Sequence, residues 1–424
     1  MKFSIITLGC KVNTYESEAM KELLLAKDFK YEDEYVNSDI VIVNTCSVTN
    51  MADNKSKKII RRIRRENDKA ILVVCGCSSQ NNTEEYQEMD IDILLGNKDK
   101  SKIVDLINEY LETHNKYIKI YNNRNLDFES MNVKRFTSQT RAFLKVQDGC
   151  NNFCSYCIIP YVRGSIRSKD FNECLKEAKI LVNNGHKEIV LTGIHTGSYN
   201  SNGKDLVDLI HELSLIEELK QIRISSIEIT ELNDKFMEEL KTNSKICNHI
   251  HIPLQAGSNY ILKKMNRKYD TEYFKNKITK IRSIRPDISI TTDVIVGHPY
   301  EDETYFNESF EFCKLINFSK IHVFPYSVRT GTVASKMPYQ VNEHDKKVRA
   351  GKLIELSDKL EEEYYKKYIN KLLTVLVEEV GEEYSIGHTS NYLKVKIYKK
   401  VEQGNFVEVY INDYINNVLT AQKN

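Results

Sequence analysis

The sequence has no run of 18 or more apolar residues and almost no net charge. The missing run excludes a membrane-spanning helix, and the apolar stretch in MKFSIITLGCKVN is too short for a secretory signal. Lys plus Arg number 61 and Asp plus Glu 60, a formal charge of +1. Overall charge therefore indicates no polyanionic partner, and any nucleic-acid signal has to be local. We expect a cytoplasmic protein with no membrane partner.

Two common catalytic arrangements are also missing. The sequence contains no glycine-rich phosphate-binding loop and nothing that resembles a Ser-His-Asp arrangement, so nucleotide hydrolysis and simple acyl transfer are unsupported. Its ten cysteines are not expected to form disulfides, because the cytoplasm keeps thiols reduced. They are more readily explained as ligands, catalytic groups or buried thiols.

The length of 424 residues favours two or three domains. In residues 1–112, short β-branched runs such as IVIVN and ILVVCG alternate with amphipathic helical patterns. Apolar strands separated by helices are typical of a parallel sheet covered on both faces. The sequence therefore predicts the α/β class, with an N-terminal doubly wound parallel-sheet domain and then a connecting segment that ends near residue 135.

A second alternation begins at AFLKV and gives six strand-helix repeats within residues 136–366. Six repeats predict a partial β/α barrel, two repeats short of a full one, with its active site at the carboxyl ends of the strands. The last segment, residues 367–424, has strands with a period of two, LLTVLVEEV, YLKVKIY and FVEVYIND. Gly and Asn turns separate them, which predicts a small antiparallel β-barrel.

The stretch GCNNFCSYCIIPYVRG holds Cys150, Cys154 and Cys157 without a nearby fourth cysteine. Structural zinc favours four ligands in C-x2-C pairs, so this C-x3-C-x2-C spacing does not suit it. Three close thiolates suit a 4Fe-4S cluster, which usually has four cysteine ligands and would here keep one iron open. The alternative is a group of unrelated thiols.

This spacing, with Tyr156 before the last cysteine, resembles the radical S-adenosylmethionine superfamily. The resemblance implies that the open iron chelates S-adenosylmethionine and that reductive cleavage of this cofactor gives a 5'-deoxyadenosyl radical. It also implies that Tyr156 lies near the adenine of the cofactor. Four residues at strand ends are further candidates for cofactor binding, with ordinary loop positions as the alternative: Thr192, Gly193, Glu228 and Gln255.

Cys10, Cys46 and Cys77 follow the first three predicted strands. In an open α/β sheet such loops lie on one edge and can converge. Their motifs TLGCKVNTYES, NTCSVT and VVCGCSSQ resemble the N-terminal domain of the methylthiotransferases. The resemblance implies a second 4Fe-4S cluster on these cysteines, whose free iron holds the sulfur that is methylated and inserted. Cys75, inside the predicted strand, is the alternative third ligand.

The motifs GCKVN and TGIHTGSY resemble the branch that acts on threonylcarbamoyladenosine at position 37 of tRNA. The resemblance implies that the six cysteines catalyse insertion of a methylthio group at carbon 2, with S-adenosylmethionine as both methyl donor and radical source. One alternative keeps the chemistry and changes the substrate, to isopentenyladenosine in tRNA or a ribosomal-protein aspartate. Another is an RNA-binding iron-sulfur sensor without turnover.

The partners implied are the tRNA anticodon loop, a low-potential electron donor and a sulfur source. The C-terminal barrel resembles the TRAM domain, which implies RNA contact, yet residues 371–424 hold six Lys against seven Asp or Glu. Affinity would depend on a few groups: Lys394, Lys396, Lys399 and Lys400. Residues 55–65, with seven Lys or Arg in eleven, are another candidate for tRNA contact. The alternative is a helix whose isoleucines pack on the sheet while its cations stay in water.

Two groups of metal-ligand residue types are expected to be structural. His249 and His251 alternate along one strand and share a face, but no Cys or carboxylate follows in ligand register, which favours a hydrogen-bonded pair over a metal site. Three further cysteines lie in helical or pre-strand patterns and are expected to be buried thiols: Cys174, Cys247 and Cys313.

Two other features leave their roles open. Arg163 and Arg167 directly follow the cysteine loop, where they could hold substrate phosphate or pair with a local carboxylate. The fifth barrel strand leads into GHPYED, with His298 and Tyr300, where the family has a GFPGE-like turn. The missing Gly removes an easy position for positive φ, so the backbone shape of this turn is open.

Overall fold

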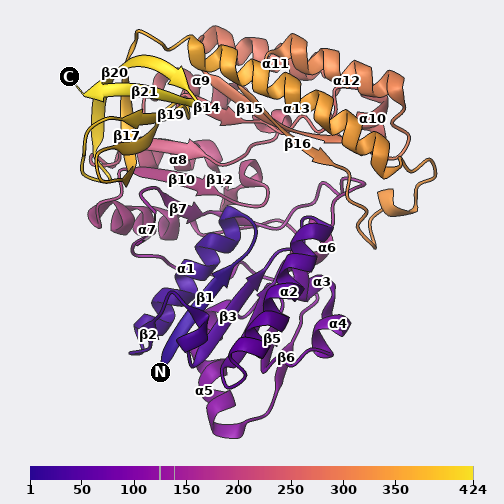
Figure 1. The fold of residues 1–424 in the computed structure, drawn as a ribbon, viewed down its shortest axis with the longest axis vertical. Coiled ribbons are helices and arrows are strands. Elements are labelled where there is room, and N and C mark those ends of the chain that lie inside the picture. The colour runs from indigo at the N-terminus through magenta and orange to yellow at the C-terminus, as the bar shows by residue number, and fades with distance from the viewer. Residues whose placement is uncertain (124–125, 138, 424) are drawn as a thin grey trace.

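The computed structural model describes residues 1–123, 126–137 and 139–423. An N-terminal sheet domain, a partial barrel and a small C-terminal barrel follow one another along the chain, and the C-terminal barrel lies beside the partial barrel, above the N-terminal domain (Figure 1). This arrangement confirms the predicted fold class. In the described residues no helix is long and apolar enough to span a bilayer.

The N-terminal domain is a parallel sheet of six strands in the order β2-β1-β3-β4-β5-β6. The strands are β1 (Lys2–Thr7), β2 (Lys30–Tyr31), β3 (Ile40–Thr45), β4 (Ile71–Gly76), β5 (Ile93–Leu95) and β6 (Tyr117–Lys119). The helices are α1 (Lys11–Leu25), α2 (Asn50–Glu66), α3 (Cys77–Asn81), α4 (Thr83–Gln87) and α5 (Ile103–Thr113). Strand β6 lies within the stretch that the sequence predicts to be only a connection.

Both faces of this sheet are covered, which explains the unbroken apolar runs. Ile40 and Ile42 of β3 pack in a core with residues of α1 and α5, whereas Val41 and Val43 pack with α2 on the opposite face. Successive side chains of a strand point to opposite faces, so a strand buried on both sides needs apolar residues throughout. The sheet is therefore doubly wound, as predicted.

The partial barrel has six parallel strands in two sheets, β13-β10-β7 and β14-β15-β16, which an isolated bridge between Ile222 and Ile246 connects. The strands are β7 (Ala142–Lys145), β10 (Glu188–Thr192), β13 (Gln221–Ile224), β14 (His249–His251), β15 (Ser289–Val296) and β16 (Lys320–Pro325). The covering helices are α6 (Ile159–Arg163), α7 (Phe171–Asn183), α8 (Leu206–Ser214), α9 (Asp234–Thr242), α10 (Asn259–Lys264), α11 (Thr271–Ile284), α12 (Glu303–Ile316) and α13 (Glu343–Lys366). Short pairs β8 (Gln147–Asp148) with β9 (Arg167–Ser168), and β11 (Asn200–Ser201) with β12 (Lys204–Asp205), complete it. The six predicted repeats are present.

The C-terminal domain is a closed barrel in the order β17-β18-β19-β21-β20. Its strands are β17 (Leu372–Val380), β18 (Ser385–Thr389), β19 (Lys394–Ile397), β20 (Phe406–Ile415) and β21 (Val418–Lys423). The sequence analysis identified β17, β19 and β20 and missed the other two. Asn416 and Asn417, at φ of 51° and 63°, form the tight turn from β20 to β21, and Asn tolerates this left-handed conformation well.

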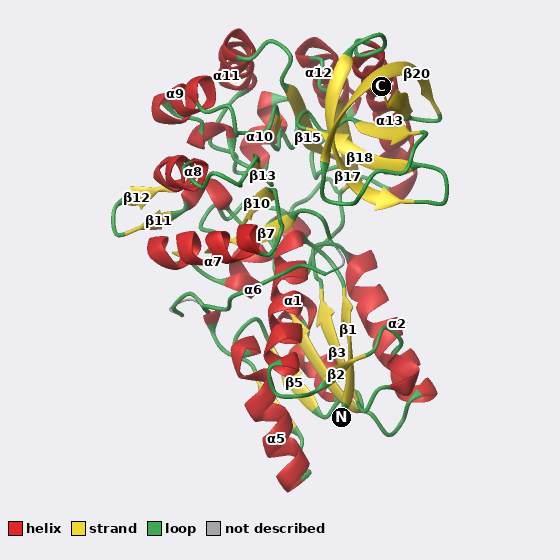
Figure 2. Cartoon of the chain, turned by 90° about the vertical axis from the view of Figure 1, so that its left-hand side faces the viewer, coloured by secondary structure: helices red, strands yellow, loops and turns green. Residues whose placement is uncertain are grey.

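Helix α1 belongs to two cores at once. Met20 and Leu24 pack in the core of the N-terminal sheet, whereas Tyr15 and Ala19 pack in the core of the barrel. The hydroxyl of Tyr15 donates to Glu177 Oε1 of α7 at 2.9 Å. Figure 2 shows α1 at the junction of the two domains, beneath β7. Since one rigid helix has both contacts, it fixes the N-terminal sheet relative to the barrel.

Replacing Tyr15 should destabilise both domains together. Tyr15 is 1% exposed, so Tyr15→Ala should lower the free energy of unfolding by about 3–5 kcal/mol, measured by urea denaturation. The matched control is Tyr273→Ala, whose side chain is 38% exposed and whose loss should change stability by less than about 0.5 kcal/mol. Equal effects of the two substitutions would show that α1 does not join the two cores.

Candidate functional site

Cys10, Cys46 and Cys77 meet at one edge of the N-terminal sheet. Cys10 precedes α1 after β1, Cys46 follows β3, and Cys77 opens α3 after β4, and these three strands are neighbours. The chain reverses its direction of progress across the sheet between β1 and β3, and such a switch point is where open α/β sheets bind ligands.

Gly9 and Asn13 hold the loops of this edge close together. Gly9 has φ of +110°, and a Cβ added there would lie 2.7 Å from Cβ of Cys46, so only glycine permits this approach. The side-chain amide of Asn13 donates to the carbonyls of Leu8 and Thr45 at 2.7 and 2.9 Å. It thereby ties the loop of Cys10 to the end of β3.

The thiols of this set lie close together. Burial, together with the neighbouring Cys77 and Cys10, raises the pKa of the Cys46 thiol to about 11. Arg163 Nε donates to Cys77 Sγ at 3.2 Å. Thiols with raised pKa values become thiolates when a metal centre balances their charge.

Cys75 points away from this edge. It is fully buried in the apolar core between the sheet and helices α1 and α5, and burial raises the pKa of its thiol to about 12. Its position supports Cys77 over Cys75 as the third ligand.

Cys150, Cys154 and Cys157 lie in the loop between β8 and α6. The backbone N–H of Cys157 donates to the carbonyl of Cys154 at 3.0 Å, which folds the loop tightly. Burial, with Cys154 and Cys150 nearby, raises the pKa of Cys157 to about 12. Each of the other two thiols faces a cation: Arg267 Nη1 donates to Cys154 Sγ at 3.2 Å, and His195 Nδ1 lies 3.8 Å from Cys150 Sγ.

His195 is held in its charged form. Burial acts to lower its pKa, but the hydrogen bond to Cys150 and the ion pair with Glu231, 2.5 Å from Nε2, raise the pKa to about 10. Hydrogen bonds and cations beside sulfur ligands stabilise an iron-sulfur cluster and tune its potential. The two cysteine sets, with these cations beside their sulfurs, therefore suit iron-sulfur clusters. A single metal ion is a different case: in the described residues no three His, Cys, Asp or Glu side chains form a group that could hold one.

The loops that carry the two cysteine sets border one cavity, and of the six cysteines Cys157 lines it. A cavity of about 210 Å³ is lined by Tyr156 and Cys157 of the barrel and by Val48 and Thr49, which closely follow Cys46. Cys77 packs directly against Ile158 and Val162, which follow Cys157. The structure thus brings together cysteines that lie in two separate domains.

The predicted cofactor contacts fall into two groups. Tyr156 and Gln255 line the 210 Å³ cavity beside Cys157, and Glu228 accepts from Arg267, the residue that contacts Cys154. Thr192 is buried, and its hydroxyl donates to the carbonyl of Val190 within its own strand, at 3.4 Å. Gly193 packs against Gln147, 3.0 Å from the position of an added Cβ. Only the first group faces the cavity or its cysteines directly.

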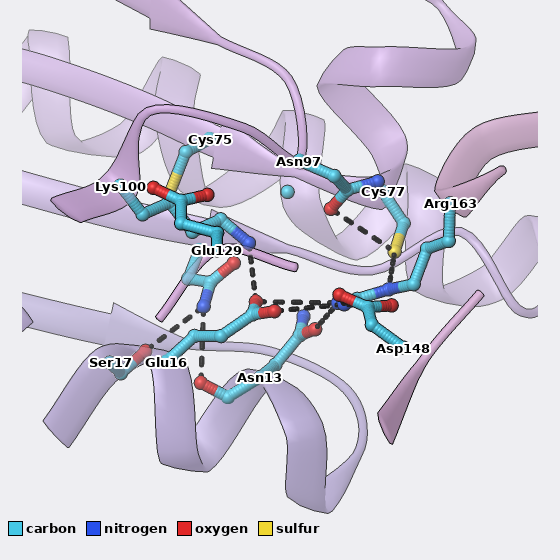
Figure 3. A network of polar contacts seen from close by, with 12 residues as sticks. Asn13, Glu16, Ser17, Cys75, Cys77, Asn97, Lys100, Glu129, Asp148 and Arg163 are labelled. Atoms are coloured by element: carbon cyan, nitrogen blue, oxygen red, sulfur yellow. Dashed lines mark hydrogen bonds and ion pairs between the residues drawn. The ribbon is translucent and has the colours of Figure 1, made fainter. Parts of the chain in front are cut away.

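A buried ion network joins the two domains beside Cys77 (Figure 3). Glu16 of α1 accepts from Arg163 Nη1 at 2.8 Å and from Lys145 Nζ at 2.7 Å, and it also pairs with Lys100. Asp148 pairs with the same Arg163 and Lys145, at 3.2 and 2.8 Å. Burial acts to raise the pKa of Glu16, but the surrounding cations hold it well below the usual range. Four cations, Lys100, Lys145, Arg163 and Arg167, surround these two carboxylates, which leaves positive charge next to the Cys77 thiol.

This network decides the role of two arginines that the sequence left open. Arg163 is fully buried, and its N–H groups donate to Cys77, Glu16 and Asn13. Arg167 Nη2 lies 3.3 Å from Asp148 Oδ2. Both arginines therefore pair with a local carboxylate, which was the alternative to binding of substrate phosphate.

The GHPYED turn keeps a left-handed residue without glycine. Tyr300 has φ of +72°, a conformation that is uncommon for non-Gly residues. His298 is fully buried; its Nε2 lies 3.0 Å from the hydroxyl of Ser155, in the cysteine loop. Burial lowers the pKa of His298 to about 4, so a neutral imidazole braces that loop.

The remaining predictions about single residues agree with the structure. His249 Nε2 and His251 Nδ1 share the hydroxyl of Thr291, at 3.0 and 2.9 Å, which makes them a hydrogen-bonded pair. The three cysteines expected to be buried thiols are at most 1% exposed: Cys174, Cys247 and Cys313.

The basic run is part of α2 and covers the sheet. Ile60 and Ile63 are buried, and several of its cations pair with carboxylates, such as Arg64 with Asp92 at 2.7 Å. Lys55, Lys58 and Arg65 are exposed, with no ion pair to any described residue. The packing alternative describes most of this run.

Sequence reasoning assigned no role to Arg267, His195 or Glu16. His195 lies in the motif TGIHTGSY and Glu16 in TLGCKVNTYES, but the sequence alone does not indicate which side chain contacts a sulfur or an arginine. Glu16 and Arg163 are 147 residues apart, and their pairing is visible only once both domains are folded.

Known proteins match the same two parts of the chain. The Radical SAM superfamily matches residues 144–313, and Uncharacterized protein family UPF0004 matches residues 2–96. The Threonylcarbamoyladenosine tRNA methylthiotransferase MtaB of Bacillus subtilis is 43% identical over 96% of this chain and 92% of its own length. The chain belongs to the radical S-adenosylmethionine methylthiotransferases. The family predicted from the motifs is thereby confirmed.

Other radical S-adenosylmethionine proteins are similar at lower levels. A tRNA-2-methylthio-N(6)-dimethylallyladenosine synthase of Thermodesulfovibrio yellowstonii is 35% identical over 96% of this chain and 95% of its own length. The solved structure of the methyltransferase TsrM from Kitasatospora setae matches with a TM-score of 0.57 at 12% identity, covering 79% of this chain and 76% of that one. This second likeness shows the fold alone. Membership of the methylthiotransferases implies an enzyme that uses S-adenosylmethionine and a 4Fe-4S cluster.

Breaking the buried network should destabilise this methylthiotransferase strongly. Arg163→Met leaves two buried carboxylates short of a cation, so it should lower the free energy of unfolding by about 3–5 kcal/mol in urea denaturation. The matched control is Lys280→Met, which removes an exposed ion pair with Asp234 and should have little effect. A loss no larger than the control's would mean that the network does not join the domains.

Proposed function

We propose that this methylthiotransferase inserts a methylthio group at carbon 2 of threonylcarbamoyladenosine at position 37 of tRNA, in the cytoplasm, with two 4Fe-4S clusters. The observation that supports this most is that the loops of the two three-cysteine sets meet between the domains. Val48 lines the same cavity as Cys157, and Cys77 packs against Ile158 and Val162. A radical enzyme with a single cluster would use the thiols of the barrel alone, so the second set between the domains favours a second cluster.

Each cysteine set would hold one cluster through three sulfurs. Cys150, Cys154 and Cys157 would ligate the first, and the second would lie on the set at the sheet edge: Cys10, Cys46 and Cys77. When bound, the clusters and two molecules of S-adenosylmethionine supply radical formation at the first set and methylation of sulfur at the second. The chain holds both sets at a fixed separation, which positions the adenine between them.

The cavity residues would position the cofactor and exclude water. Tyr156 and Gln255 line the cavity next to Cys157, where they can contact the adenine and the amino acid part of S-adenosylmethionine. Arg267 bridges Cys154 and Glu228, so the cluster loop and a cofactor contact are held by one side chain. A dry, enclosed site prevents a carbon radical from being lost to side reactions.

The tRNA would approach the C-terminal barrel, with its anticodon loop reaching the space between the cysteine sets. Lys396, Lys399 and Lys400 follow one another along and after β19, and Lys396 Nζ lies 4.5 Å from the ring centre of Tyr384. Cations beside exposed aromatic rings suit phosphate contact and base stacking. A loop nucleotide can be splayed out of its stack, as presentation of its base edge requires. A low-potential electron donor and a sulfur source complete the partners.

The substrate assignment rests on relatives. The relative named for threonylcarbamoyladenosine is 43% identical and the one named for dimethylallyladenosine is 35% identical, which favours the former. Mass spectrometry of tRNA nucleosides from a deletion strain should show loss of the methylthiolated threonylcarbamoyl nucleoside and retention of the methylthiolated isopentenyl one. The reverse pattern would assign the protein to the other substrate, and no change in either would contradict both.

The two clusters should be countable in the purified protein. After anaerobic reconstitution, the wild type should bind about eight irons, and a variant with Ala at Cys150, Cys154 and Cys157 about four. A variant with Ala at Cys10, Cys46 and Cys77 is the matched counterpart and should also bind about four. A wild type with about four irons that falls to none in the first variant would mean that the N-terminal thiols hold no cluster.

A further inference from the structure

A second, larger cavity of about 490 Å³ lies inside the partial barrel. Its walls include His249, Ser289 and Lys320, the first residues of β14, β15 and β16, and also Ile224 and Ser225 at the carboxyl end of β13. The cavity therefore extends along the inside of the barrel from the amino ends of its strands. Its volume is in the range of pockets that bind small ligands. The radical chemistry proposed above uses the small cavity beside Cys157 and leaves this larger one without a role.

The C-terminal barrel closes the amino end of this cavity with Tyr392. This residue lies in the turn between β18 and β19, at φ of +67°. Its ring stacks on His249 and His388, with ring centres 5.1 and 4.8 Å apart, and the guanidinium groups of Arg141 and Arg223 lie 5.1 and 4.9 Å from its centre. The cavity therefore has a built, rigid floor.

The walls carry much more positive than negative charge. Five Lys or Arg side chains line the cavity: Lys11, Arg141, Arg223, Lys320 and Lys394. The same walls have a single carboxylate, that of Glu361.

Three of these five cations pair with nearby carboxylates. Arg141 pairs with Glu378 at 3.2 Å, Arg223 with Glu188 at 2.6 Å and Lys320 with Glu361 at 2.5 Å.

Lys11 and Lys394 form no ion pair with any residue that the structure describes. Lys11 is exposed and Lys394 is half-buried, and positive charge without a protein partner attracts an anion.

Two features connect this cavity to the cysteine sites, one along the chain and one across the barrel. Lys11 directly follows Cys10 in the chain. On the barrel side, His251 lines the large cavity while its ion-pair partner Asp293, 3.2 Å from Nε2, lines the small one beside Cys157. A ligand whose reacting atom lies between the cysteine sets can therefore extend a substituent into the large cavity.

We infer that the barrel cavity binds the carboxylate of the threonylcarbamoyl group, with Lys11 as its main cation and Lys394 deeper in the cavity. This inference rests on the proposed function. Threonylcarbamoyladenosine has a free carboxylate on its N6 substituent, whereas an isopentenyl group is apolar. Carbon 2 and the carbon that carries N6 flank N1 on the same edge of adenine, so a base whose carbon 2 lies between the cysteine sets places its N6 substituent to the side of them. Lys11 is thus a residue that determines substrate specificity.

Neutralising either partner should reveal this contact. The probes are two anticodon stem-loop RNAs, identical except that one has threonylcarbamoyladenosine at position 37 and the other its uncharged primary amide. Binding to the reconstituted holoenzyme is measured by fluorescence anisotropy, and methylthiolation by mass spectrometry. The wild type should bind the acid about ten to a hundred times more tightly than the amide, and Lys11→Gln should remove most of this preference.

Matched variants separate a specific contact from general damage. Lys27→Gln, at an exposed lysine without an ion pair, should keep the full preference, and Lys11→Arg should restore much of it. The iron content of Lys11→Gln should equal that of the wild type, which shows that the adjacent Cys10 still ligates its cluster. Lys394→Gln should reduce the preference by a smaller factor than Lys11→Gln.

Each contrary result has a distinct meaning. Equal binding of acid and amide by a wild type that methylthiolates the acid would overturn the inference and leave the proposed function standing. Equal weakening of both RNAs in Lys11→Gln would also overturn it, because Lys11 would then contact a tRNA phosphate. A wild type that modifies neither RNA, but modifies one with isopentenyladenosine, would refute the proposed function itself.

Discussion

The buried ion network around Arg163 determines how the two halves of the active site face each other. Glu16 comes from the N-terminal domain, Lys145 and Arg163 come from the barrel, and all three are at most 2% exposed. Buried charges are tolerated only when every partner is in place, so the network specifies one relative position of the domains. Arg163 also donates to Cys77, which couples that position to the environment of the sheet-edge thiols. Helix α1 adds the apolar part of the same junction through Tyr15 and Ala19.

The barrel is open to chemistry at one end and closed at the other. Its carboxyl end presents Cys157, Tyr156 and Gln255 to the small cavity, while Tyr392 of the C-terminal domain fills its amino end. The C-terminal barrel therefore lines the cavity that we infer to bind the threonylcarbamoyl carboxylate, and it is also a candidate for RNA contact. Lys394, which sequence reasoning grouped with surface lysines, lines the inner cavity.

Sequence reasoning could predict the features that local patterns encode. Alternating apolar runs predicted the doubly wound sheet and six barrel strands, and the spacing of Cys150, Cys154 and Cys157 indicated the superfamily that residues 144–313 match. The role of these cysteines as cluster ligands stays a prediction. Short strands could not be predicted in this way. Strand β6, for example, has three residues, which are too few to show a periodic pattern.

Long-range pairing could not be predicted at all. The choice between Cys75 and Cys77 depended on which residue leaves the strand, and the partners of Arg163 depended on the folded junction. Lys11 was visible as a letter of GCKVN, but its place in the barrel cavity was not.

The most direct test of the account is electron paramagnetic resonance of the reconstituted, reduced protein. Because Cys77 packs against the residues that follow Cys157, two reduced clusters on these cysteine sets should lie close enough to couple magnetically. The account predicts a wild-type spectrum that differs from the sum of the spectra of the two triple-Ala variants. A wild-type spectrum equal to that sum would show that the two cysteine sets do not share one active site.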